Sequence, residues 1–176
     1  FGVVQAAGSV SRKDLLEPNH LFQSSTQEER WGPYKCGFIR NPEHIWLKNL
    51  KYLGSLSALR LWYIHVRPAI MEMDSFTTFC LEGAVTLLEN AIQERMKQLT
   101  KWLTILNDSE AAGACDELQQ LLGSASKTQY LEDLLCTKPM QHATYPQSIQ
   151  AFTATQKTLV TQFFESEIQR ITSLPF

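Results

Sequence analysis

The chain has 176 residues, of which 44% are hydrophobic and 19% charged, and its formal net charge is −2 at pH 7. This composition is typical of one globular protein and argues against a disordered chain. The slightly negative charge argues against a nucleic-acid binder whose affinity depends on neutralising phosphates. We expect no membrane span, because charged residues interrupt the most apolar stretch, residues 59–71, well short of the ~20 apolar residues that a span needs.

Residues 1–40 show little hydrophobic periodicity and contain several glycines and prolines. We expect an irregular, extended N-terminal arm over 1–40, with a short strand at 1–5 and one helical turn at 12–16. The helical domain is then expected over 41–176. A segment of this length without structure of its own is typically functional or covers a partner. The chain starts with Phe1, which leaves open an upstream segment or a processed leader.

The pattern changes at Asn41, which can cap a helix, and Pro42 suits the first helical position. This predicts a helix over 42–66. The helix is expected to end there because Pro68 disfavours helical backbone angles at Arg67. The second half of this helix is apolar on nearly all sides, which is typical of a central helix. We therefore expect Trp62 to be buried.

A second, longer helix is predicted over 75–106, with Asp74 or Ser75 as its cap. Apolar residues repeat every seven positions along it, and Leu99 lies in the middle of this stripe. Its 32 residues correspond to about 48 Å at 1.5 Å per residue. It therefore extends beyond its neighbours, and Leu99 is expected to face the core.

Further helices are expected over 110–122, 127–136 and 147–172. The connections between the predicted helices are short, which favours antiparallel neighbours. The predicted fold is therefore all-α: an antiparallel helical bundle of four to five helices with an irregular N-terminal arm.

Reactive side chains do not form a recognisable catalytic set. Cys36 has basic neighbours, but no known signature surrounds it, and a structural loop cysteine is the favoured interpretation. The four histidines do not pair at metal-ligand spacing. Phosphate-binding glycine loops and the G-x-S-x-G motif are absent from the sequence. We expect no enzyme activity, no catalytic residue, no cofactor and no metal.

Three patterns allow a binding interpretation beside a structural one. L-x-x-L-L segments at 118–122 and 131–135 are suited to docking in a partner's groove, but any amphipathic helix needs the same spacing to reach its own core. Aromatic and basic residues alternate over 30–46, as they do in single-strand nucleic-acid binders. Flanking glutamates argue against that function, and we expect this segment to pack the arm against the first helix.

The four cysteines are Cys36, Cys80, Cys115 and Cys136. Together with the long amphipathic helices they resemble four-helix cytokines, and Asn107 would be a glycosylation acceptor in a secreted chain. The turns near 67–74 and 107–109 are shorter than the long crossover connections of that family. Because a domain of this size does not need disulfides, we favour free thiols and an intracellular location, nuclear or cytoplasmic. A secreted cytokine-like ligand with two disulfides is the alternative.

The functional hypothesis is a non-enzymatic helical protein–protein interaction module, either a scaffold or a subunit of a larger complex. Its contacts are expected through the arm and the long second helix, because large apolar patches are seldom left exposed on a monomer. The partner is a protein or a second copy, and neither nucleic acid nor a membrane. The residues expected to contact it are Leu15, Leu16, Leu21, Phe22, Trp31, Trp102 and Leu106.

Overall fold

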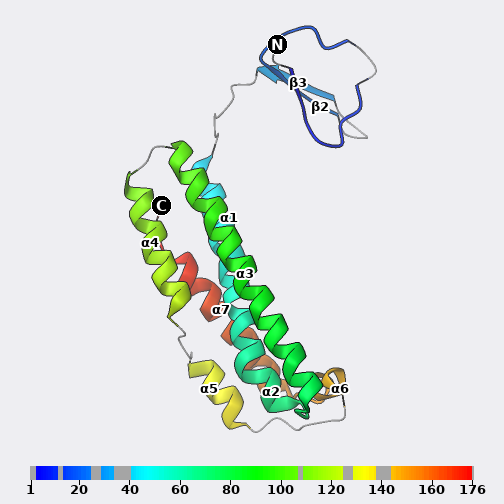
Figure 1. Cartoon of the computed structure of the whole chain (residues 1–176), viewed down its shortest axis with the longest axis vertical. Coiled ribbons are helices and arrows are strands. Elements are labelled where there is room, and N and C mark those ends of the chain that lie inside the picture. The colour runs from blue at the N-terminus through cyan, green and yellow to red at the C-terminus, as the bar shows by residue number, and fades with distance from the viewer. Residues whose placement is uncertain are drawn as a thin grey trace. The chain divides into compact units, whose positions relative to one another are not determined.

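The computed structural model describes residues 3–11, 14–24, 29–33, 41–106, 109–124, 129–137 and 144–175, with only the backbone for 109–112. The chain divides into two compact units, Phe1–Pro42 and Glu43–Phe176. Each unit is described by itself (Figure 1). The described residues are mostly helical, and a small three-stranded sheet lies in the first unit.

The first unit is built on strands, so the expectation of an irregular arm is wrong. Its strands are β1 (Val3–Gln5), β2 (His20–Ser24) and β3 (Glu29–Pro33). β1 pairs with β2 in parallel, and β2 pairs with β3 in antiparallel register, which places Phe22 opposite Trp31. Only 1% of Phe22 is exposed, so this unit buries an aromatic side chain of its own.

The expected strand at 1–5 is confirmed over Val3–Gln5 by β1, and Phe1 and Gly2 lie outside the described residues. The expected helical turn at 12–16 is wrong, because Asp14–Leu16 is not helical; Arg12 and Lys13 lie outside the described residues. The strands have only three to five residues. β2 and β3, which were not predicted, carry too little alternation to be recognised from the sequence.

The first helix is longer than predicted and contains a π-helical segment. α1 (Pro42–Leu61) continues through η1 (Trp62–Val66) into α2 (Arg67–Ile70). The backbone N–H of Arg67 donates to the carbonyl of Trp62, five residues earlier. A proline ring clashes with the carbonyl four residues before it. Widening the preceding turn is one way to accommodate Pro68, so the helix continues where the sequence predicted its end.

α3 (Ser75–Leu106) has the predicted bounds. Asp74 caps it: its Oδ1 accepts the backbone N–H of Thr77 at 2.7 Å. Hydrogen bonds from the side chain and the backbone of Thr77 lower the pKa of Asp74 below its ordinary value. A carboxylate at this position also interacts favourably with the helix dipole.

The remaining helices are α4 (Ser109–Gly123), α5 (Gln129–Cys136), α6 (Tyr145–Gln150) and α7 (Ala154–Thr172). The single closing helix predicted over 147–172 is therefore wrong, because helical structure is interrupted between Gln150 and Ala154. Thr153 caps α7 by accepting the backbone N–H of Gln156, and the Gln156 side chain accepts the backbone N–H of Thr153. This reciprocal capping box restarts the helix.

In Figure 1, α3 runs alongside α1 in the opposite direction, and α4 returns beside α3. Two clusters of buried side chains form the core. The first joins α1, α3, α4 and the end of α7, and the second joins the end of α1 with η1, α2, α5 and α7. Trp62 is 5% exposed and Leu99 is 2% exposed, so both predicted core positions are confirmed.

A buried polar network joins α1, α4 and α7. Glu167 is fully buried, accepts a hydrogen bond from the Ser57 hydroxyl at 2.6 Å and pairs with Arg170 at 2.7 Å. Arg170 also donates to the carbonyl of Leu121 near the end of α4. The ion pair and the hydrogen bonds satisfy the buried carboxylate of Glu167, which would otherwise be costly to bury.

α1 and α7 also approach each other closely at Gly54. A Cβ at this position would lie 2.9 Å from the Cα of Ile168, so only glycine fits without a backbone shift. The close approach fixes the spacing of these two helices.

Candidate interaction surface

α3 carries apolar residues on two opposite faces. Its inner face contributes Leu81, Ile92, Leu99 and Leu103 to the buried residues. These positions are separated by multiples of about 3.6 residues, as expected for one face of a helix. The buried inner face accounts for the packing of α3 against the other helices. It does not account for the apolar residues on the opposite face.

The outer face of the first half of α3 is apolar and uncovered in this structure. Phe76, Phe79 and Leu87 are 74%, 73% and 70% exposed. Cys80 and Gly83 lie between them, and a side chain at Gly83 would meet nothing within 4 Å. At 100° per residue these five positions fall within roughly a third of the helix circumference. We call these five residues the α3 stripe.

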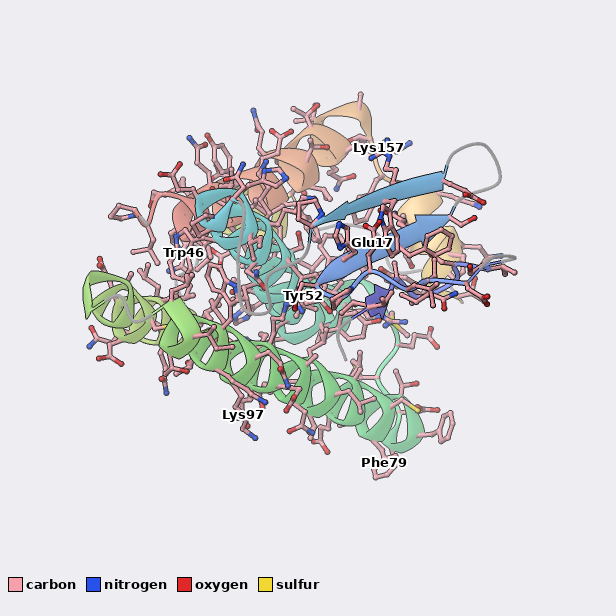
Figure 2. All side chains as sticks on the ribbon, turned by 90° about the horizontal axis from the view of Figure 1, so that it is seen from above. Glu17, Trp46, Tyr52, Phe79, Lys97 and Lys157 are labelled. Carbon is pink, nitrogen blue, oxygen red and sulfur yellow. The ribbon has the colours of Figure 1, made fainter. Side chains whose placement is uncertain are left out.

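The same outer face is polar along the second half of α3. Its exposed residues there are Asn90, Glu94, Lys97, Gln98 and Lys101. Figure 2 shows Phe79 and Lys97 both pointing from α3 away from the other helices. We call this second set the α3 polar half. One continuous helix face therefore changes character near residue 88.

The surroundings of the α3 stripe are acidic. Between Met71 and Glu94 the chain has five carboxylates and no lysine or arginine: Glu72, Asp74, Glu82, Glu89 and Glu94. Arg60 of α1 approaches Glu89 to 3.9 Å and also donates to the carbonyl of Leu122. The stripe is thus an apolar surface flanked by negative charge.

The predicted contact residues of the first unit differ in accessibility. Leu15 and Leu21 are half-buried, Leu16 is exposed and Phe22 is buried. Trp31 is 40% exposed, stacks on His20 at a centroid distance of 4.9 Å, and donates its indole N–H to Glu17 at 3.2 Å. Phe22 and Trp31 thus support the sheet, and Leu16 is the most accessible of the set.

Trp102 and Leu106, the contact residues predicted on the long helix, are half-buried and pack against the first core cluster. The two L-x-x-L-L segments also face the core, as the structural interpretation predicted. Their buried leucines are Leu118, Leu122, Leu131 and Leu134. The exposed apolar surface of α3 therefore lies mainly at the opposite end from Trp102.

Thiol chemistry at the described cysteines is limited. Cys80 and Cys136 are exposed free thiols, and Cys115 is a buried one. Burial raises the pKa of Cys115, which lowers its thiolate fraction and makes it a poor nucleophile. Cys36, the candidate named from the sequence, lies outside the described residues.

A cleft of about 1350 Å³ lies mainly between α3 and α4. Its lining mixes apolar residues such as Met96 with charged ones such as Arg60 and Lys101. Across the parts of the chain that the structure describes, no three His, Cys, Asp or Glu side chains gather as a metal site would require. The described lining includes the Cys115 thiol beside Asp116, but the raised pKa of that thiol makes it a poor nucleophile.

No family model matches this sequence, and neither the curated proteins nor the solved structures contain a match. Among the described residues, no helix combines the length and apolar character needed to cross a membrane.

The α3 stripe was missed in the sequence because the seven-residue repeat of the inner face dominated the pattern. The signal was present: residues 76, 80, 83 and 87 are spaced by four, three and four positions. Such spacing also predicts one helix face. Projecting the helix would have placed this second apolar face opposite the first.

Proposed function

We propose that this chain is a non-enzymatic helical protein–protein interaction module, and that the α3 stripe is its main contact surface. The helical unit acts as an antiparallel bundle that holds α3 rigid through its inner face. The observation that carries the proposal is the exposure of Phe76, Phe79 and Leu87 on one helix face. Large apolar side chains gathered in this way typically mark an interaction site.

The partner we propose is an amphipathic helix with an apolar face and flanking lysines or arginines. An exposed apolar helix face is a standard docking surface for a second helix. Gly83, in the middle of the stripe, allows a close approach. The carboxylates around the stripe favour a basic partner through charge complementarity.

The acidic surroundings argue against a second copy as the partner. Pairing two stripes would bring the flanking carboxylates of both chains together, and like charges at an interface cost free energy. The unlike-charged partner is therefore favoured over self-association.

Binding of designed peptides to the full chain tests this proposal. The first peptide is an amphipathic helix of about 20 residues with leucines on one face and flanking lysines, and the second replaces every lysine by glutamate. The stripe variant carries Phe76→Ser, Phe79→Ser and Leu87→Ser. The control variant carries Lys97→Ser, Gln98→Ser and Lys101→Ser in the α3 polar half.

We expect the lysine peptide to bind the native chain and the control variant, and to bind the stripe variant about tenfold more weakly or worse. The glutamate peptide should bind poorly to all three. Equal binding of the two peptides, or unchanged binding to the stripe variant, would contradict the proposal. Sedimentation of the chain alone provides a further test: a dimer that the stripe variant loses would identify a second copy as the partner.

The first unit provides a second proposed surface, centred on the exposed Leu16 and the edge of Trp31. Its contribution is measured by comparing the full chain with a chain that starts at Asn41. If removing residues 1–40 leaves every partner and the oligomeric state unchanged, this part of the proposal fails.

Three free thiols support the intracellular interpretation over the secreted alternative. Two disulfides in a chain with four cysteines would require two of Cys80, Cys115 and Cys136 to pair with each other. Mass measurement after alkylation, with and without reductant, decides between them: four free thiols favour the module, and two bridges favour the secreted ligand.

A further inference from the structure

An aromatic pocket of about 480 Å³ lies at the other end of the helical unit from the Trp102 region and is independent of the α3 stripe. It opens between η1, α6 and α7. The residues that line it are Leu59, Trp62, Tyr63, Tyr145, Ile149, Phe152, Lys157, Val160, Thr161 and Phe164. Its volume and mainly apolar walls are typical of pockets that bind small organic molecules.

The walls of this pocket are held in place by ring contacts. The Trp62 ring lies 6.5 Å from Phe152 and 5.9 Å from Phe164, centroid to centroid, and both pairs are tilted. The indole N–H of Trp62 donates to the Tyr145 hydroxyl at 3.0 Å. These contacts fix the rings and offer flat apolar surfaces to a ligand.

The charge at the pocket is positive. Lys157 is the one charged residue in the lining, and it forms no ion pair within the described part of the chain. Figure 2 labels this lysine, which extends from α7. Among the described residues that line the pocket, none is a carboxylate.

A second cation lies behind the pocket wall. The Arg67 guanidinium lies 4.5 Å from the ring centre of Tyr63 and 4.2 Å from that of Tyr145, and both rings line the pocket. Its Nε is buried without a hydrogen-bond partner among the described residues, and no described carboxylate pairs with it. Cation–π contacts stabilise this charge without neutralising it.

A hydrogen-bond donor is also present. The Tyr145 hydroxyl accepts the Trp62 N–H, which leaves its own proton free to donate, and no acceptor for it occurs among the described residues. The site thus combines ring surfaces, one lysine, one buried arginine and one hydroxyl proton.

We propose that this pocket binds a small organic anion with an apolar, ring-containing body. The body packs against Trp62, Phe152 and Phe164, and the anionic group, a carboxylate or similar oxyanion, is held by Lys157 and the Tyr145 hydroxyl. Arg67 adds positive potential from behind the wall. Aromatic walls also suit organic cations. Here, however, Arg67 already occupies the space between the two tyrosines, and Lys157 repels a second positive charge.

Calorimetric titration of the full chain with 1-naphthaleneacetate tests this proposal. The neutral control ligand is 1-naphthalenemethanol, and the cationic one is 1-naphthylmethylammonium. Three variants separate the contributions. Lys157→Ala removes the exposed cation, Thr161→Trp fills the pocket mouth, and Lys97→Ala removes a lysine of the α3 polar half as the matched control.

We expect the native chain to bind the anion at least about tenfold more tightly than the neutral or cationic ligand, as a charge-assisted hydrogen bond implies. Lys157→Ala should remove most of this preference, Thr161→Trp should weaken all binding, and Lys97→Ala should change nothing. Equal affinity for anion and alcohol, or the same loss in both lysine variants, would overturn the proposed anion specificity. Binding that Thr161→Trp leaves unchanged, or no detectable binding by the native chain, would overturn the proposed location.

Discussion

The two halves of the outer face of α3 belong to one helix and are both exposed to solvent. One half carries Phe76, Phe79 and Leu87, whereas the other carries Asn90, Glu94, Lys97, Gln98 and Lys101. Polar and charged side chains are expected on a helix face that is exposed to solvent, so the polar half needs no further explanation. The apolar half contributes nothing to the described core. The buried residues of α3, such as Leu81 and Ile92, all lie on its inner face. The difference indicates that the first half of the outer face is shaped by something other than folding.

The comparison has an electrostatic side as well. The apolar half lies within a stretch that has carboxylates and no lysine or arginine, whereas the polar half contains Lys97 and Lys101. In the proposed function, charge of one sign around this exposed apolar surface selects the partner by charge. An apolar stripe that served only folding would not need carboxylates around one half of the helix face and lysines in the other half.

The largest expected effect contrasts the inner and outer faces. Leu99→Ala should lower the free energy of unfolding by about 2–5 kcal/mol, because it leaves a cavity in the first core cluster. Leu87→Ala should change it by about 0.5 kcal/mol or less, since the side chain is already exposed. Urea unfolding of both variants measures the difference. A large loss for Leu87→Ala would mean that the stripe is needed for folding.

A smaller effect concerns the charges around the stripe. Binding of the lysine peptide should weaken severalfold when the salt concentration rises from about 0.05 to 0.5 M, because salt screens exposed charges. Replacing Glu72, Glu82 and Glu94 by glutamine should remove most of that dependence. If binding does not depend on salt and persists in the glutamine variant, the proposed selection of the partner by charge is wrong. The apolar contact would then be the remaining source of affinity.

The smallest effect is at the helix start that carries the stripe. The pKa of Asp74 is lowered in the folded chain. Its contribution to the free energy of unfolding is therefore present above the ordinary pKa of 3.8 and is lost as the pH falls through the lower pKa of the folded state. Asp74→Asn should abolish this part of the acid dependence. Thermal unfolding between about pH 2 and 6 measures it, and identical pH profiles for both chains would contradict the capping role of the carboxylate.

The long, periodic elements could be predicted from the sequence, and the local adjustments could not. The bounds of α3 followed from an unbroken inner stripe and a cap at Asp74. Pro68 predicted the end of the helix. The sequence does not show that Trp62, Val66 and Ile70 are all packed in the core, so the continuation through a π-helical turn was missed. The break before α7 did have a local signal, because Thr153 and Gln156 have capping-box spacing.

The surfaces were harder to predict than the core. Trp102 and Leu106 were predicted to contact a partner at the end of a helix that extends beyond its neighbours. In the structure they pack against the first core cluster, to which α4 and the end of α7 contribute. The aromatic pocket joins residues more than a hundred positions apart, such as Trp62 and Phe164. Long-range proximity of this kind follows from the packing of helices and is not visible in the spacing of residues.

The most direct test of the α3 stripe as a docking surface is the alkylation rate of Cys80. Cys80 lies within the stripe, while Cys136, on α5, is also exposed and provides an internal control. Saturating lysine peptide should slow alkylation of Cys80 at least about tenfold and leave Cys136 unchanged, and the glutamate peptide should protect neither. If Cys80 reacts at the same rate with and without bound lysine peptide, the partner does not cover the stripe and the central claim is wrong.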